Sequence, residues 1–118
     1  MAEALCHCPE CQKMTSSAFS TNIVVPSSAF TLLQGTPKTY TFVRGAEKHT
    51  TSFCGDCGTT ISKVVEGFEK FKDVVIVEAG TLDEGQGFEN FKIDAELYAK
   101  NRADWVKEIA GARQVETI

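Results

Sequence analysis

Cysteine is concentrated in the stretch Cys6-His7-Cys8-Pro9-Glu10-Cys11, which holds three of the five cysteines of the chain, and the other two lie in Cys54-Gly55-Asp56-Cys57. Thiolates spaced this closely are typical ligands of a soft metal ion, and zinc is the commonest such ion in proteins. A zinc ion with three protein ligands keeps a fourth position for a reactant, whereas four protein ligands close the site. The number of cysteines that meet at one ion therefore separates a reactive site from a structural one.

The second group, Cys54 and Cys57, is followed by Gly58, which is the pattern of a zinc knuckle. A tight turn of this kind directs backbone N–H groups at the sulfur atoms, and glycine adopts the positive φ that the turn requires. A thioredoxin-like redox pair is the alternative, but such a pair belongs at a strand–helix junction, and here strand-like sequence flanks both sides. The pattern favours metal binding over redox chemistry.

Spacing alone leaves two arrangements of the five cysteines open. In the first, Cys8 and Cys11 join Cys54 and Cys57 in one closed four-cysteine site, and Cys6 is left over. In the second, Cys6, Cys8 and Cys11 hold one ion by themselves and leave a position for an incoming thiolate or water.

Other polar side chains near the cysteines are candidates for supporting roles. We expect His7 to face away from its neighbouring ligands and to make a hydrogen bond rather than to bind the ion. His49 precedes the second pair by five residues on a predicted strand, and we expect an ordinary surface or half-buried side chain there. Lys13, Arg44 and Lys48 are candidates for a basic rim that attracts an anionic ligand.

Beyond residue 18 the sequence has mostly the composition and periodicity of β-strands. The strand-like segments cover residues 23–25, 30–33, 38–43, 49–53, 59–65, 74–77 and 93–98, and the β-branched run at 74–77 predicts a buried central strand. Residues 1–18 are polar and predict a metal-organised loop. The one predicted helix covers residues 104–110 and ends at Gly111. We therefore expect a single, mostly β domain over residues 1–118 with a short C-terminal helix.

The overall composition of the 118 residues restricts the partners and the location of the protein. The formal net charge of −4 and the scarcity of clustered Lys and Arg argue against binding to nucleic acid or to an anionic membrane. No stretch approaches the roughly 18 apolar residues of a membrane span, and residues 1–5 lack the features of a signal peptide. We therefore expect a cytoplasmic protein that binds neither nucleic acid nor membrane.

Four motifs occur in a distinctive order along the chain: Cys6-His7-Cys8-x-x-Cys11-Gln12-Lys13, Phe53-Cys54-x-x-Cys57-Gly58-Thr59, Ala79-Gly80-Thr81-Leu82-Asp83 and Arg102-Ala103-Asp104-Trp105-Val106. This ordered set resembles the glutathione-dependent formaldehyde-activating enzyme family, which also includes centromere protein V. The resemblance extends from about residue 5 to residue 108. It implies a tent-like zinc-binding β fold with two separate metal sites.

The resemblance also assigns metal sites to the cysteines. Cys6, Cys8 and Cys11 match the triplet that holds the catalytic zinc of the family, and Cys54 and Cys57 match half of its structural site. The other half is a CxCG pair on an upstream hairpin, which this sequence does not contain. We therefore expect one zinc at the first site, whereas a second zinc needs a further source of ligands. The missing hairpin leaves a sheet edge, which favours a homodimer.

The function that the resemblance implies is that of a zinc-dependent carbon–sulfur lyase, similar to an S-(hydroxymethyl)glutathione synthase. Such an enzyme joins or separates a thiol such as glutathione and a small aldehyde such as formaldehyde. The alternative is a non-catalytic zinc-binding module or a glutathione carrier, which binds a ligand or a protein partner without turnover.

Overall fold

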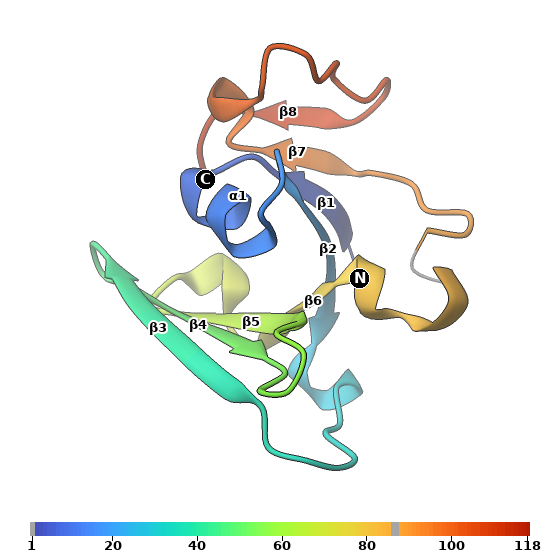
Figure 1. Ribbon diagram of the computed structural model, residues 1–118. Coiled ribbons are helices and arrows are strands. Elements are labelled where there is room, and N and C mark those ends of the chain that lie inside the picture. The colour runs from blue at the N-terminus through green and yellow to red at the C-terminus, as the bar shows by residue number, and fades with distance from the viewer. Residues whose placement is uncertain (1, 86–87) are drawn as a thin grey trace.

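One curved β-sheet dominates the computed structural model, which describes residues 2–85 and 88–118 (Figure 1). Its eight strands follow the order β3-β4-β5-β6-β2-β1-β7-β8, in which β1 is parallel to β7 and β7 to β8, while the other neighbours are antiparallel. The strands are β1 (Ala2–Cys6), β2 (Ser20–Pro26), β3 (Lys38–Arg44), β4 (Glu47–Phe53), β5 (Thr60–Glu66), β6 (Val74–Glu78), β7 (Ala95–Leu97) and β8 (Arg113–Val115).

The helical elements among the described residues are short. The α-helix α1 covers Pro9–Thr15, and the 3-10 turns are η1 (Ser27–Ala29), η2 (Glu69–Phe71), η3 (Ala79–Thr81), η4 (Asp83–Gly85) and η5 (Ala99–Asn101). None of these helices is long and apolar enough to cross a membrane.

The sheet bends between β5 and β6, where only two residue pairs, Ser62–Val77 and Lys63–Ile76, are in register. The bend divides the sheet into one limb of β3, β4 and β5 and a second limb of β6, β2, β1, β7 and β8. Helix α1 lies in the angle between the two limbs (Figure 1). Residues on the facing sides of the limbs can therefore meet residues of α1.

Residues 2–18 contain a strand and a helix, so the prediction of a loop is wrong. Pro9 occupies the start of α1, where its missing N–H costs nothing, and the Sγ of Cys8 caps the helix by accepting the N–H of Cys11 at 3.4 Å. Ser16 ends the helix in the left-handed conformation with φ of 52°. Five residues of β1 pair with β2, which orders the segment before the helix.

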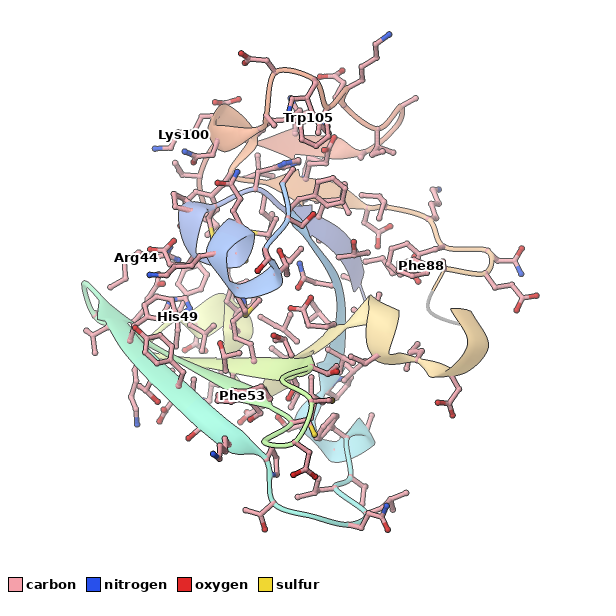
Figure 2. The ribbon with its side chains drawn as sticks, viewed as in Figure 1. Arg44, His49, Phe53, Phe88, Lys100 and Trp105 are labelled. Carbon is pink, nitrogen blue, oxygen red and sulfur yellow. The ribbon has the colours of Figure 1, made fainter. Side chains whose placement is uncertain are left out.

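The predicted helix over residues 104–110 does not form, and these residues are turns and irregular backbone. The N–H of Ile109 donates instead to Oε2 of Glu96 at 2.8 Å, so a tertiary hydrogen bond takes the place of a helical one. Trp105 is 78% exposed and lies on the outer side of the molecule near β8 (Figure 2). A mostly β fold with a single short helix is confirmed, but the helix is at Pro9–Thr15.

The other strand predictions have mixed outcomes. The segments 23–25, 38–43, 49–53, 59–65, 74–77 and 93–98 coincide with or contain parts of β2 to β7, and β6 lies centrally between β5 and β2 as predicted. The predicted strand over residues 30–33 is wrong, because this segment is irregular and Leu33 is 90% exposed. The sequence reading missed β1 and β8.

Candidate metal centre

Three thiols converge where β1 passes into α1. Cys6 ends the strand, Cys8 caps the helix and Cys11 lies in its first turn. Their sulfur atoms all lie within 4.8 Å of one another, and all three residues are buried. We call Cys6, Cys8 and Cys11 the thiol cluster. The strand end, the helix cap and the first helical turn together explain why a CxCxxC spacing brings three sulfur atoms to one point.

The thiol cluster is the one group of three or more His, Cys, Asp or Glu donors that comes together within residues 2–85 and 88–118. Cys54 and Cys57 are not part of it. The described residues therefore bring together the three thiols of the first group and not the four cysteines of the closed site. A buried set of three sulfur donors fits zinc, and the cluster could hold such an ion.

The three thiols differ in the direction in which their pKa values are shifted. Hydrogen bonds from Cys6 and Cys8 lower the pKa of Cys11 despite its burial, and the charge of Lys63 acts in the same direction. The pKa of Cys6 is raised by its hydrogen bonds to Cys11 and Cys8 and by burial. One thiolate is thus favoured at Cys11, and a soft divalent ion would displace the protons that remain on the other two.

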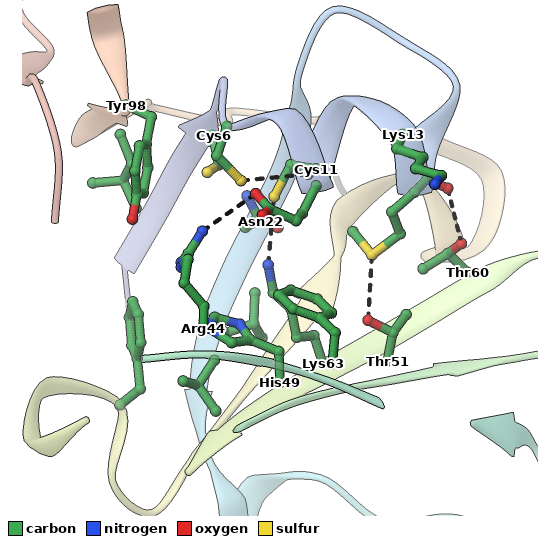
Figure 3. Close-up of a pocket in the computed structure, with 18 of the residues that line it drawn as sticks. Cys6, Cys11, Lys13, Asn22, Arg44, His49, Thr51, Thr60, Lys63 and Tyr98 are labelled. Atoms are coloured by element: carbon green, nitrogen blue, oxygen red, sulfur yellow. Dashed lines mark hydrogen bonds and ion pairs between the residues drawn. The ribbon is translucent and has the colours of Figure 1, made fainter. Parts of the chain in front are cut away.

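Lys63 reaches the thiol cluster from the opposite limb of the sheet. Its Nζ lies 3.5 Å from Sγ of Cys11 (Figure 3). Burial opposes the charged form of Lys63, but the neighbouring Cys11, Cys6, Cys8 and Glu78 outweigh burial and raise its pKa. A positive charge therefore stands beside the sulfur that ionises most readily.

The thiol cluster opens into a cavity of about 640 Å³ that lies between the limbs of the sheet. This volume is within the roughly 300–1,000 Å³ typical of small-molecule sites. Much of the wall is apolar, and its larger side chains are Tyr40, Phe42, Phe53, Phe71, Leu97 and Tyr98. A ligand in this cavity could place one end at the sulfur atoms and its remainder against the apolar wall.

Arg44 lies on the wall of the cavity at the end of β3. Its guanidinium carbon is 5.3 Å from the centroid of the Tyr98 ring, and its nitrogens are 3.3 Å from Oε2 of Glu10 and 3.4 Å from Oε2 of Glu47. Both nitrogen–oxygen distances are long for charge-assisted hydrogen bonds. The guanidinium group is thus held in place while its donors remain weakly engaged.

The two other candidates for a basic rim differ in their positions. Lys13 lines the cavity together with Arg44, as the sequence predicts. Lys48 is not among the lining residues, and its Nζ pairs with Oε2 of Glu66 at 3.2 Å on the exposed face of the sheet. Two of the three candidates predicted from sequence therefore lie at the cavity.

His7 faces away from the cluster and supports it, as predicted. Its side chain is fully buried, its Nε2 lies 2.8 Å from Oε1 of Glu96, and its backbone N–H donates to the carbonyl of Leu97 at 2.9 Å. Glu96 also accepts hydrogen bonds from Nε2 of Gln114 at 2.7 Å and from the N–H of Ile109. These bonds outweigh burial and lower the pKa of Glu96 to about 2. Nothing in the sequence pointed to Glu96, because its partners are far away along the chain.

His49 is not the ordinary surface or half-buried side chain that we expected. It is 5% exposed, its ring stacks on Phe42 with centroids 4.6 Å apart, and its Nε2 lies 2.8 Å from Oε2 of Glu47. It also lines the cavity (Figure 3). The bend of the sheet buries this face of β4, and strand periodicity alone does not reveal the bend.

The second cysteine pair lies apart, on the loop that joins β4 and β5. The N–H of Cys54 donates to the carbonyl of Thr59 at 2.8 Å, and the N–H of Gly58, whose φ is 77°, donates to the carbonyl of Cys54 at 2.9 Å. The predicted tight turn is therefore present. Hydrogen bonds from Thr59 and Cys54 lower the pKa of the exposed Cys57. Within the described residues no third donor joins this pair.

The sequence was compared with known proteins. The family model described as glutathione-dependent formaldehyde-activating enzyme matches residues 1–101. No curated protein matches the sequence. The matched range contains the thiol cluster, the pair on the β4–β5 loop and Lys63.

Proposed function

This chain belongs to the glutathione-dependent formaldehyde-activating enzyme family, and we propose that it is a zinc-dependent carbon–sulfur lyase that joins or separates glutathione and formaldehyde or a similar small aldehyde. The observation that carries this proposal is the position of three buried thiols at the end of a cavity of about 640 Å³. The cavity can admit a ligand of the size of a tripeptide thiol, and the thiols lie where its sulfur atom would end.

We assign the zinc ligands to Cys6, Cys8 and Cys11, whose sulfur atoms are close enough to share one ion. A zinc ion bound there would stabilise a substrate thiolate or polarise an aldehyde oxygen at its fourth position. The Sγ of Cys8 accepts a hydrogen bond from the backbone N–H of Cys11, and this bond orients the sulfur atom.

The cavity walls would bind the remainder of the thiol substrate. Glutathione carries two carboxylates, and Arg44 presents weakly engaged guanidinium donors in a fixed position over Tyr98. Lys13 adds a second positive charge along the same wall. The aromatic side chains exclude water from the thiol and the aldehyde, which strengthens electrostatic interactions within the cavity.

The second cysteine pair, Cys54 and Cys57, would take no part in this reaction. Cys54 and Cys57 offer two sulfur ligands on an exposed turn, so a second zinc there would need donors beyond the described residues. Strand β3 forms one edge of the sheet, and we propose a homodimer through such an edge as the oligomeric state. Five cysteines without a disulfide are consistent with a reducing compartment, and we propose the cytoplasm as the location.

The alternative function is that of a glutathione carrier or a zinc-binding module without turnover. The weakly engaged Arg44 and the cavity support this alternative as much as they support the lyase, since both features concern the binding of a ligand. Thiols add to formaldehyde without a catalyst. The two functions therefore differ only in whether the protein makes this addition and its reversal faster than the uncatalysed rate.

The test compares Cys6→Ser with the matched variant Cys57→Ser. Native mass spectrometry counts the bound zinc, and NMR exchange spectroscopy measures the rate at which glutathione and S-(hydroxymethyl)glutathione interconvert. We expect the wild type to exceed the uncatalysed rate, Cys6→Ser to lose one zinc and the acceleration, and Cys57→Ser to keep both. A wild-type protein that binds glutathione without accelerating the exchange would be a carrier.

A further inference from the structure

Lys63 has no part in the proposed function so far, although its ammonium group contacts the thiol cluster. Its Nζ lies 3.5 Å from Sγ of Cys11, and its side chain lines the cavity. Figure 3 shows this side chain extending from β5 toward the cluster. The thiols are carried by β1 and α1, so Lys63 approaches the cluster from the other limb of the sheet.

The chemistry of Lys63 excludes metal binding and suggests that Lys63 binds a negatively charged group. An ammonium group has three N–H donors and no lone pair, so in its charged form it cannot bind a metal. Arg44 is directed at Glu10 and Glu47, at distances of 3.3 Å and 3.4 Å. The charge of Lys63 therefore lies next to a group bound at the sulfur atoms.

We propose that Lys63 binds the negatively charged oxygen that forms beside the sulfur atom of the substrate, an inference that rests on the proposed function. When the thiolate forms its bond to the aldehyde carbon, the π electron pair of the carbonyl moves onto the oxygen. That oxygen then takes a proton from water. The thiol released its own proton to water earlier, when the thiolate formed. In the reverse direction the oxygen loses its proton, the carbon–sulfur bond breaks and its electron pair returns to sulfur.

In both directions the charged oxygen is two bonds away from the substrate sulfur. The Lys63 ammonium donates at most one of its three hydrogens to Cys11, which leaves others for this oxygen. A fixed cation in a site shielded from water stabilises a charge that develops next to it, and no proton transfer from the lysine is required.

A purely structural role for Lys63 makes a different prediction. If Lys63 only compensated the charge of the thiol cluster, its loss would weaken zinc binding and would affect all ligands of the cavity equally. If it binds an anionic oxygen, its loss affects only those ligands that carry such an oxygen near the sulfur atom.

The test uses two stable thioethers of glutathione and the zinc-loaded protein. S-carboxymethylglutathione has an anionic oxygen near its sulfur atom, and S-methylglutathione has none. Calorimetry gives the ratio of their affinities for the wild type, Lys63→Met, Lys63→Arg and the matched variant Lys13→Met, whose lysine lines the same cavity. Zinc content and the thermal midpoint are measured for each protein. Should Lys63→Met fail to hold zinc, Lys63→Gln takes its place.

We expect the wild type to prefer S-carboxymethylglutathione by about tenfold or more, as a hydrogen bond to a charged group implies. Lys63→Met should lose this preference, and Lys63→Arg and Lys13→Met should retain it. A preference that survives in Lys63→Met, or that is missing in the wild type, would overturn the inference. A wild type that shows the preference but does not accelerate the exchange would disprove the lyase while leaving the role of Lys63 in binding.

Discussion

His7 and Glu96 form a fully buried pair, in which Nε2 of His7 lies 2.8 Å from Oε1 of Glu96 and neither side chain is exposed. His7 stands between two members of the thiol cluster, and Glu96 belongs to β7. Glu96 is held in turn by Ile109 and Gln114 of the C-terminal segment. The orientation of the thiols therefore depends on residues that are about a hundred positions away along the chain.

Replacing Glu96 should weaken both the fold and the metal site. In Glu96→Gln the buried charge is lost and one hydrogen-bond acceptor becomes a donor. We expect the free energy of unfolding to fall by about 3 kcal/mol, as for other broken buried pairs, and zinc affinity to fall by about 10- to 100-fold. Urea denaturation and competition with a zinc chelator measure the two effects. Glu66→Gln is the control, since Glu66 is 63% exposed and its pair with Lys48 should contribute less than about 1 kcal/mol. Unchanged zinc affinity in Glu96→Gln would contradict this account.

Glu78 should make the stability of the protein depend on pH. It is buried on β6 opposite Asn22 of β2, and its Oε1 has no hydrogen-bond partner within the described part of the chain. Burial raises the pKa of Glu78 from 4.5 to about 7, although Lys63 acts against the increase. Between these values the unfolded chain has lost a proton that the folded protein keeps, so stability falls as pH rises through this window.

Glu78→Gln should remove most of this pH dependence. The difference in the free energy of unfolding between pH 4.5 and pH 8 should shrink by an amount on the order of 3 kcal/mol, since each pKa unit corresponds to about 1.4 kcal/mol. Chemical denaturation at a series of pH values measures this difference. A variant whose stability declines with pH as steeply as that of the wild type would refute the assignment.

Gly67 is required at the end of the β4–β5 hairpin. Its φ is 82°, and an added Cβ atom would collide with the backbone oxygen of Ala46. We expect Gly67→Ala to lower the free energy of unfolding by about 2–4 kcal/mol, because strain and a steric clash add. Gly35→Ala is the matched control, since Gly35 has a φ of 76° and open space around it. Urea denaturation should give a clearly larger loss for Gly67→Ala, and equal losses would show that the close approach to Ala46 does not exist.

Arg44 should determine which thiols the protein binds. Its guanidinium group lies over Tyr98 with weakly engaged donors, so a carboxylate of the ligand can reach it. We expect Arg44→Met to weaken the binding of glutathione by about tenfold or more and to leave the binding of cysteamine, a thiol without carboxylates, unchanged. Calorimetry with both thiols tests this expectation. A similar loss for both thiols would indicate that Arg44 shapes the cavity rather than binding the ligand.

The local part of the site could be predicted from sequence, and the long-range part could not. Cys6, Cys8 and Cys11 are close together along the chain, so their spacing alone predicts a metal-binding group. Lys63 and His49 lie on strands where most neighbouring residues are polar, so nothing local marks them as facing inward. Only the bend of the sheet turns them toward the cavity.

The same distinction explains the errors in the fold. The strand-like composition of β3 to β5 is local and predicts these strands, whereas β1 and β8 are strands because they pair with distant partners. Helical periodicity around Trp105 is overridden by the hydrogen bond between Ile109 and Glu96. The polar composition of residues 1–18 predicts a loop, although Pro9 stands at the first position of α1, where proline is favoured.

The central claim is that three sulfur atoms hold zinc and leave one position open. X-ray absorption at the zinc edge tests it most directly, on the variant Cys54→Ser/Cys57→Ser, which removes the second pair. We predict three sulfur neighbours at about 2.3 Å and one oxygen or nitrogen neighbour at about 2.0 Å, with the latter replaced by sulfur when glutathione is added. Four sulfur neighbours before glutathione is added, or a variant that binds no zinc, would contradict the account.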